Sequence, residues 1–265
     1  MAREVSSISR VGTSEPFELQ VSRGQIAYHD FVHKFGYNPD IGATDETVWS
    51  QGGLYVYPTS ASTMYISSSS TADTSAGTGA RTATVLGLDA NFDEISETVS
   101  LNGQTGVQLN GALNWYRVNR IIVNTAGSGG ANAGVLYVGT EATPTGGVPT
   151  NKYATVAIGD NQTLMCLWTV PKGYTAYLHQ KDVSASSSAD KFAIFTLVAR
   201  PDGGVFNVKD RVTLANNSTN IPYWNPIVFT EKTDVEVRAV ADSVGGTITA
   251  SATLDITYIK NGESL

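Results

Sequence analysis

Apolar and polar residues alternate in short runs along most of this chain from Leu54 onward. The clearest two runs lie between Gly77 and Gly103, in GTGARTATVLGLDANFDEISETVSLNG, where apolar residues are separated by small or polar ones. This spacing is typical of half-buried strands and not of helices. Asp89 to Asp93 supplies turn-forming residues between the runs, and Asn102-Gly103 is a strong turn signal. The stretch therefore predicts an antiparallel β-hairpin.

Similar runs continue to the end of the chain, and loops rich in Gly, Ser, Thr and Asn separate them. Regular short strands with this punctuation are typical of sandwiches and barrels. We expect an all-β protein with one or two antiparallel β-sandwich domains of jelly-roll or immunoglobulin-like type. The runs include LYVYP, TMYIS, LNWYRVNRIIV, VLYVG, YATVAI, TLMCLWTV, YTAYLH, FAIFTLVAR, VFNVKDRVTL, PIVFT, DVEVRAVA and TITASATLDITYI.

The first 53 residues differ from the rest, because their apolar residues are scattered without a sustained period. A segment with spaced aromatic anchors usually lies across another surface. We therefore expect residues 1–53 to form an extended N-terminal arm that docks on a partner. Within the arm, Ala27 to Phe35 could form one or two helical turns that end at Gly36. The predicted docking contacts are Phe17, Phe31, Phe35, Tyr37 and Trp49.

A domain boundary is expected in the run TEATPTGGVPTNK, where prolines and glycines interrupt the strand rhythm. The expected division is an arm at 1–53, a first sandwich at 54–145 and a second at 146–265. A single longer sandwich is the alternative. No strict repeat relates the two halves. Each half does carry a predicted hairpin ahead of a strand that contains an arginine, at Tyr116-Arg117 and at Ala199-Arg200.

The composition indicates a surface that is polar but carries few charges. Hydrophobic residues make up 41% of the 265 residues, which is ample for a core, and charged residues make up only 15%, against about 25% in ordinary domains. The net charge of −7 offers no broad basic field for nucleic acid. No signal peptide and no membrane-spanning run is evident, so we expect a soluble protein with no membrane insertion. The single cysteine, Cys166, lies in an apolar run and is expected to be a small buried hydrophobe.

Two motifs have the spacing of metal ligands, but neither is complete. His29 and His33 stand four residues apart, as in zinc hydrolases, yet the expected glutamate and a third ligand are missing. Asp89, Asn91 and Asp93 have calcium-loop spacing, but the glycine and the bidentate glutamate of an EF-hand are absent. We expect no metal ion and no other cofactor.

Signals for catalysis are equally weak. Gly77-Thr-Gly79 lacks the later glycines and the helix of a phosphate loop, and no serine sits in a nucleophile elbow near His179. Two carboxylates could face one another as a glycosidase pair, but sequence does not give that distance. We therefore expect a non-enzymatic protein.

Four tryptophans are scattered through the chain, at Trp49, Trp115, Trp168 and Trp224. This scatter favours core or subunit contacts over one carbohydrate-binding platform.

Several motifs together resemble a family of virion structural proteins of tailed bacteriophages, notably phages of cyanobacteria. They are the hairpin sequence above, YRVNRIIVNTAGSGGANAGVLYVG, QTLMCLWTVPKGYTAYL and FTEKTDVEVRA, with FVHKFGYNPDIG and ETVWSQGGLYVYP upstream. The resemblance runs from about Phe31 to about Val240. It implies a virion component assembled in the host cytoplasm: a capsid decoration protein, a neck component or a fibre-like adsorption subunit. It also implies binding to other virion proteins and, by analogy, a homo-oligomer such as a trimer.

Two other functions stay open from the sequence. A host-receptor or glycan binder would use distal loops together with aromatic residues such as Tyr153, Trp168, Tyr223 and Trp224. A glycan hydrolase is the third hypothesis, although the chain lacks the long β-helix that such phage enzymes often use.

Overall fold

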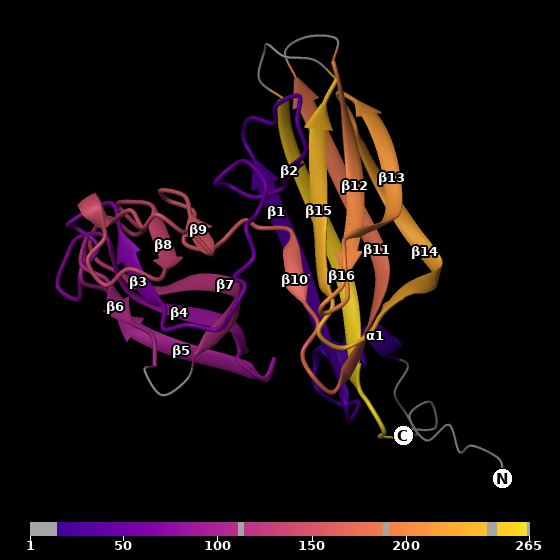
Figure 1. Cartoon of the computed structure of the whole chain (residues 1–265), viewed down its shortest axis with the longest axis horizontal. Coiled ribbons are helices and arrows are strands. Elements are labelled where there is room, and N and C mark those ends of the chain that lie inside the picture. The colour runs from indigo at the N-terminus through magenta and orange to yellow at the C-terminus, as the bar shows by residue number, and fades with distance from the viewer. Residues whose placement is uncertain (1–14, 111–113, 188–190, 243–247, 264–265) are drawn as a thin grey trace.

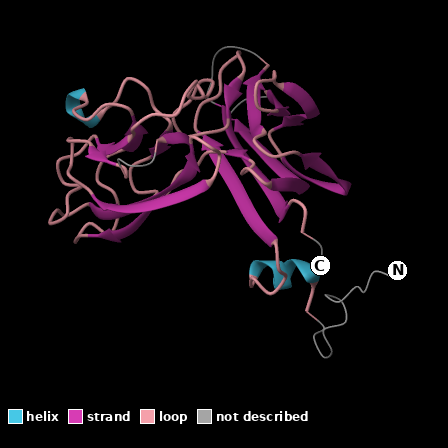
Figure 2. Cartoon of the chain, turned by 60° about the horizontal axis from the view of Figure 1, so that its bottom comes forward, coloured by secondary structure: helices cyan, strands magenta, loops and turns pink. Residues whose placement is uncertain are grey.

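The chain folds into two β-structured bodies that lie side by side (Figure 1). A computed structural model describes residues 15–110, 114–187, 191–242 and 248–263. Most of the regular structure is antiparallel strand, and the described helices are the short α1 and the single-turn η1 (Figure 2). The all-β sandwich class is therefore confirmed. None of the helices in these ranges is long and apolar enough to cross a membrane.

The elements are α1 (Phe17–Ser22), β1 (His29–Asn38), β2 (Glu46–Thr47), β3 (Tyr65–Ser68), β4 (Ala80–Asp89), β5 (Glu94–Ser100), β6 (Val107–Gln108), β7 (Trp115–Ala126), β8 (Leu136–Gly139), η1 (Thr145–Gly147), β9 (Ala154–Val156), β10 (Leu167–Thr169), β11 (Tyr174–Ser187), β12 (Phe192–Arg200), β13 (Asn207–Ala215), β14 (Ser218–Phe229), β15 (Asp234–Ala241) and β16 (Ile248–Lys260).

The larger body, which we call the C-terminal sandwich, consists of two facing sheets. The first, the β1 sheet, has the order β1-β16-β11-β14. The second, the β12 sheet, has the order β10-β15-β12-β13, and β2 pairs beside β15. Alternate residues of each strand point inward, including Leu254 and Ile256 from β16 and Phe195 and Leu197 from β12, all fully buried.

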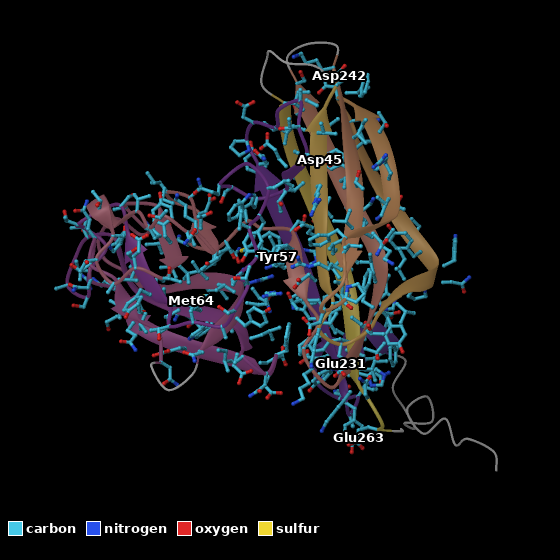
Figure 3. The ribbon with its side chains drawn as sticks, viewed as in Figure 1. Asp45, Tyr57, Met64, Glu231, Asp242 and Glu263 are labelled. Atoms are coloured by element: carbon cyan, nitrogen blue, oxygen red, sulfur yellow. The ribbon has the colours of Figure 1, made fainter. Side chains whose placement is uncertain are left out.

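The smaller body, which we call the inserted body, occupies the chain between β2 and β10. Its sheets have the orders β5-β4-β7 and β6-β3-β8-β9. Their inner faces enclose a second core that includes Met64, Val85, Ile121 and Leu136. Figure 3 shows Met64 within this body.

The two bodies share the segment that runs into β10. Met165 and Leu167 belong to the core of the inserted body, whereas Cys166 and Trp168 belong to the core of the C-terminal sandwich. Successive side chains of an extended chain point to opposite sides. The uninterrupted apolar run of this segment therefore reflects burial on both faces. Cys166 is buried and free, as predicted.

The helical turns predicted over Ala27 to Phe35 are wrong. This stretch lies largely in β1, which pairs antiparallel with β16 from His29 opposite Ile259 to Asn38 opposite Ala250. Local signals favoured a helix, but ten paired positions with a strand more than 200 residues away outweigh them. In Figure 1 the indigo β1 accordingly lies with the orange and yellow strands.

The bodies also divide the chain differently from the expected ranges 1–53, 54–145 and 146–265. β1 and β2 are strands of the C-terminal sandwich, so this part of the expected arm is integrated into a sheet. β8 pairs with β9 across the expected boundary at 139–152, because that loop connects two strands of one sheet. Residues 1–14 of the expected arm lie outside the described residues.

The hairpin predicted from Gly77 to Gly103 is confirmed in β4 and β5, which pair from Thr82 opposite Ser100 to Leu88 opposite Glu94. Asp89 Oδ1 accepts hydrogen bonds from the backbone N–H groups of Asn91 and Asp93, at 2.8 and 2.9 Å. The Asp89 carboxylate therefore organises the turn.

Candidate docking surface

The outward face of the β1 sheet brings together side chains from all four of its strands. One row across the sheet consists of Phe31, Thr257, Tyr177 and Val228, and another consists of Tyr37, Ser251, Ser184 and Ser218. Val32 packs against the core and Lys34 is buried, so the alternate residues Phe31 to Tyr37 of β1 point outward. We call the set Phe31, Phe35, Tyr37, Tyr177, Trp224 and Val228 the docking face. On this sheet face, polar residues such as Ser251 of β16 and Ser184 of β11 lie between the apolar residues of β1 and those of β14.

Three of the five predicted docking residues lie on this face. Phe31 and Tyr37 are exposed and belong to the free margin of β1. Phe35, between them, is half-buried because the Arg120 guanidinium of the inserted body lies 5.1 Å from its ring centroid. The structure thus brings these residues together on one strand.

The other two predicted docking residues lie elsewhere. Phe17 is exposed on α1, and its ring meets His29 edge-on at 5.7 Å. Trp49 is 3% exposed in the core of the inserted body, where its indole N–H donates to the carbonyls of Gly52 and Gly53. Its packing leaves almost no surface for a partner, so we leave Trp49 out of the docking face.

Trp224 is the most exposed of the large hydrophobic residues that the structure describes, at 94%. Leu178 and Gln180 of β11 pair with Ile227 and Pro222 of β14. Four residues of β14 therefore lie opposite one residue of β11, and they form a large irregular bulge. The spacing of tryptophans along the chain gave no signal for this exposure, since it depends on the register of two strands. The local run IPYWNP, with two prolines around the aromatic pair, was the signal available.

The bulge is anchored from below. The Tyr223 hydroxyl donates to Asp210 Oδ2 of β13 at 2.6 Å, and the buried Lys181 Nζ lies 2.7 Å from the same oxygen. Hydrogen bonds from Lys181 and Tyr223 hold the pKa of Asp210 below its ordinary value, although burial opposes them. Trp224 therefore projects from a fixed base.

A buried ion-pair cluster joins the two bodies. Arg117 of β7 donates to both carboxylate oxygens of Asp234 at the start of β15, at 2.9 and 3.1 Å. Arg200 of β12 and Thr169 of β10 also donate to this carboxylate, each at 2.6 Å. Burial acts to lower the pKa of Arg117, but the hydrogen bond to Asp234 and the negative charge of Asp234, with smaller contributions from Tyr116 and Tyr55, together raise it. The guanidinium is thus held charged at the contact.

A second cluster lies beside the first, around Tyr57, which Figure 3 shows between the bodies. The Tyr57 hydroxyl donates to Glu236 Oε2 at 2.9 Å, and Arg238 pairs with the other oxygen. Burial raises the pKa of Glu236, and Arg238 only partly offsets this. Together the two clusters and the shared segment at β10 make one rigid unit of the two bodies.

The edge strand β1 also forms hydrogen bonds to the inserted body. Lys34 Nζ donates to the backbone carbonyl of Asn119, and Arg120 donates to the carbonyl of His33 at 2.7 Å. Lys34 is fully buried, and this burial, with the nearby charge of Arg120, holds its pKa well below the ordinary value.

The weak metal motifs have structural roles. His33 Nδ1 lies 2.6 Å from Asp255, and His29 Nδ1 lies 2.9 Å from the carbonyl of Ala27. Asp89 Oδ1 accepts the two backbone hydrogen bonds of the turn. In the part of the chain that the structure describes, no group of three or more His, Cys, Asp or Glu side chains is placed to hold a metal ion.

Comparisons with known proteins do not assign this chain to a family. No family model matches the chain, and no curated protein sequence matches it. Among solved structures, the chain is similar to infectious bursal disease virus of the Gx strain at 12% identity, over 89% of this chain and 73% of that one, with a TM-score of 0.26. It is also similar to the VP2 subviral particle of infectious bursal disease virus at 13% identity, over 90% and 74% of the chains, with a TM-score of 0.23. At these TM-scores the likeness carries no argument.

Proposed function

We propose that this protein is a non-enzymatic structural component of a tailed-bacteriophage virion, and that it binds neighbouring virion proteins through its docking face. The observation that carries the proposal is the indole of Trp224, 94% exposed on an anchored bulge and on the same sheet face as Phe31 and Tyr37. Exposed aromatic side chains on a rigid base are the residues that dominate the energy of protein interfaces. The motifs that resemble virion proteins of cyanobacterial phages support the same assignment.

The margin at β14 favours contact through side chains and not through strand addition. Pro222 and Pro226 lie in this edge strand and have no N–H to donate. Prolines at a sheet edge block pairing with another strand. A partner would therefore receive the Trp224 side chain in a pocket of its own.

The test is incorporation into particles. The double variant Trp224→Ser/Tyr37→Ser should reduce the copies of this protein in purified particles about tenfold or more, since each residue is a candidate hot spot. The matched control is Val56→Ser/Ile158→Ser, which removes two exposed apolar residues of the inserted body. An unchanged copy number for the first variant, counted by quantitative mass spectrometry on folded protein, would reject the docking face.

Experiments on the purified protein identify which kind of partner the docking face binds. We propose a homo-oligomer, with a trimer as the working state. If sedimentation velocity shows an oligomer that Trp224→Ser dissociates, then the docking face joins copies of this chain. An oligomer that survives the substitution, together with lost incorporation, assigns the face to a different virion protein.

A second candidate function is binding of a host-surface saccharide. The four aromatic residues expected for it do not converge: Tyr223 points toward Asp210, Trp224 points outward, and Tyr153 packs against the core of the inserted body. Trp168, however, lines a cleft between the bodies. This cleft is the observation that favours the second function.

A further inference from the structure

A large cavity lies where β1, the edge strand of its sheet, meets the inserted body. It has a volume of about 540 Å³, within the range of about 300–1,000 Å³ of small-molecule sites. Phe31, Trp168 and Tyr258 line it from the C-terminal sandwich, and Glu94, Asn119 and Arg120 line it from the inserted body. We call this cavity the interbody cleft.

The cleft is lined by a residue, Asn119, with a buried acceptor that has no partner among the described residues. Asn119 Oδ1 is buried and makes no hydrogen bond to any described residue. Leaving a buried acceptor unpaired costs about 1–3 kcal/mol. A hydroxyl group in the cleft would supply the missing donor.

The charged groups that line the cleft already have hydrogen-bond partners within the protein. Lys34 donates to the Asn119 carbonyl, and His33 pairs with Asp255. The Tyr258 hydroxyl donates to Glu94 at 3.3 Å, and burial raises the pKa of the Glu94 carboxyl. The partners of Lys34 and Arg120 are neutral backbone carbonyls, so an anion is the competing class of ligand. The hydrogen-bonding groups of the cleft also offer donors and acceptors to a neutral ligand.

The aromatic groups supply the apolar part of the site. Phe31 stands partly exposed at the rim, while Trp168 and Tyr258 pack against one another at 5.3 Å between ring centroids. A site that combines aromatic rings with a few polar groups suits a ligand with both C–H and hydroxyl surface. Because the Arg117–Asp234 pair and the β10 segment hold the bodies together, the cleft is preformed and binding needs no closure.

We propose that the interbody cleft is a binding site for a short neutral saccharide. Its hydroxyl groups bond to Asn119, Glu94 and Arg120, and a C–H face of a ring packs against Phe31 at the rim. This inference rests on the second candidate function, saccharide binding, and the cleft shares Phe31 with the docking face. Particle incorporation of the Trp224→Ser/Tyr37→Ser variant and saccharide titration of the cleft therefore test the two roles separately.

The test uses the indole N–H signals of the full chain labelled with ¹⁵N-tryptophan. Glucose, galactose, mannose, N-acetylglucosamine, cellobiose, maltose, lactose and chitobiose are titrated in turn, with sodium sulfate as an anion comparison. At least one saccharide should shift the Trp168 signal saturably and leave those of Trp49, Trp115 and Trp224 in place, because these three do not line the cleft. Trp168→Phe assigns the signal.

The matched variants are Ser96→Phe, which fills the cleft from its wall, and Ser100→Phe, on the same strand but outside the cleft. Both serines are exposed, so neither change should disturb folding. Ser96→Phe should weaken binding at least tenfold, Glu94→Gln should weaken it less, and Ser100→Phe should leave it unchanged. The proposal is overturned if no saccharide shifts Trp168, if Ser96→Phe binds as well as the parent, or if sulfate produces the same shift.

Discussion

Arg117 and Asp234 form a two-pronged ion pair across the contact between the bodies, with side chains only 5% and 3% exposed. The guanidinium belongs to the inserted body and the carboxylate to the C-terminal sandwich, 117 positions apart in the chain. Its partner Arg200 reaches the same carboxylate from β12. One aspartate thus fixes the relative position of two folding units.

Arg117→Met should therefore destabilise the protein strongly. Removing one partner of a buried pair costs about 3–5 kcal/mol, because the other charge stays buried. Urea unfolding followed by tryptophan fluorescence measures the loss. Arg81→Met, at a half-buried arginine of β4, is the control and should cost less than about 1 kcal/mol. Equal losses for the two variants would show that the pair with Asp234 has no special weight.

Glu236→Gln should change how stability depends on pH. The folded state raises the pKa of Glu236 above its unfolded value, so the folded state binds the proton more readily. The contribution of Glu236 is then most favourable at acidic pH and is lost as pH rises through the folded pKa. The free energy of unfolding of Glu236→Gln minus that of the parent should grow more positive from pH 4 to pH 8. A difference that is flat or falls over this range contradicts the prediction.

Cys166 should be inert while the protein is folded. Burial raises the pKa of its thiol to about 12, so the thiolate fraction falls by about three orders of magnitude relative to a free cysteine. A chromogenic disulfide reagent should react at once in denaturant and extremely slowly in buffer, with Cys166→Ser as the blank. Fast reaction in buffer would mean that the segment at β10 opens readily.

Gly36→Ala should prevent normal folding. A Cβ at Gly36 would lie 2.1 Å from the carbonyl oxygen of Val48 and 2.3 Å from the backbone nitrogen of Cys166. Both are backbone atoms that cannot move aside, so we expect a loss of about 4 kcal/mol or more. Gly42→Ala is the control, since its added Cβ would meet only the Glu46 carboxylate at 3.1 Å. Thermal melts of the two variants should differ clearly.

The sequence was sufficient for what is specified locally. The hairpin of β4 and β5 follows from alternation and from the turn chemistry of Asp89, and the apolar run around Cys166 indicated a buried segment. These features depend on residues within a few positions of one another. No distant partner is needed to explain them.

Features that depend on distant partners were missed. The partner of β1 is β16, so nothing near Phe31 in the chain marks it as a strand of the C-terminal sandwich. Arg117 and Arg200 were noticeable as similarly placed arginines, but only the fold brings both to Asp234. The exposure of Trp224 likewise follows from a register shift against β11. Such pairings are set by tertiary contacts and leave no periodic trace.

The pairing of β1 with β16 also determines when the docking face can form during synthesis. Phe31 of β1 is synthesised early and Trp224 of β14 late. β16 lies between β1 and the pair β11-β14 in the sheet, and it is synthesised after both residues. A nascent or prematurely terminated chain that lacks β16 cannot present the two margins on one surface. If the docking face has the proposed role, recruitment into a particle selects completed subunits without a separate proofreading factor.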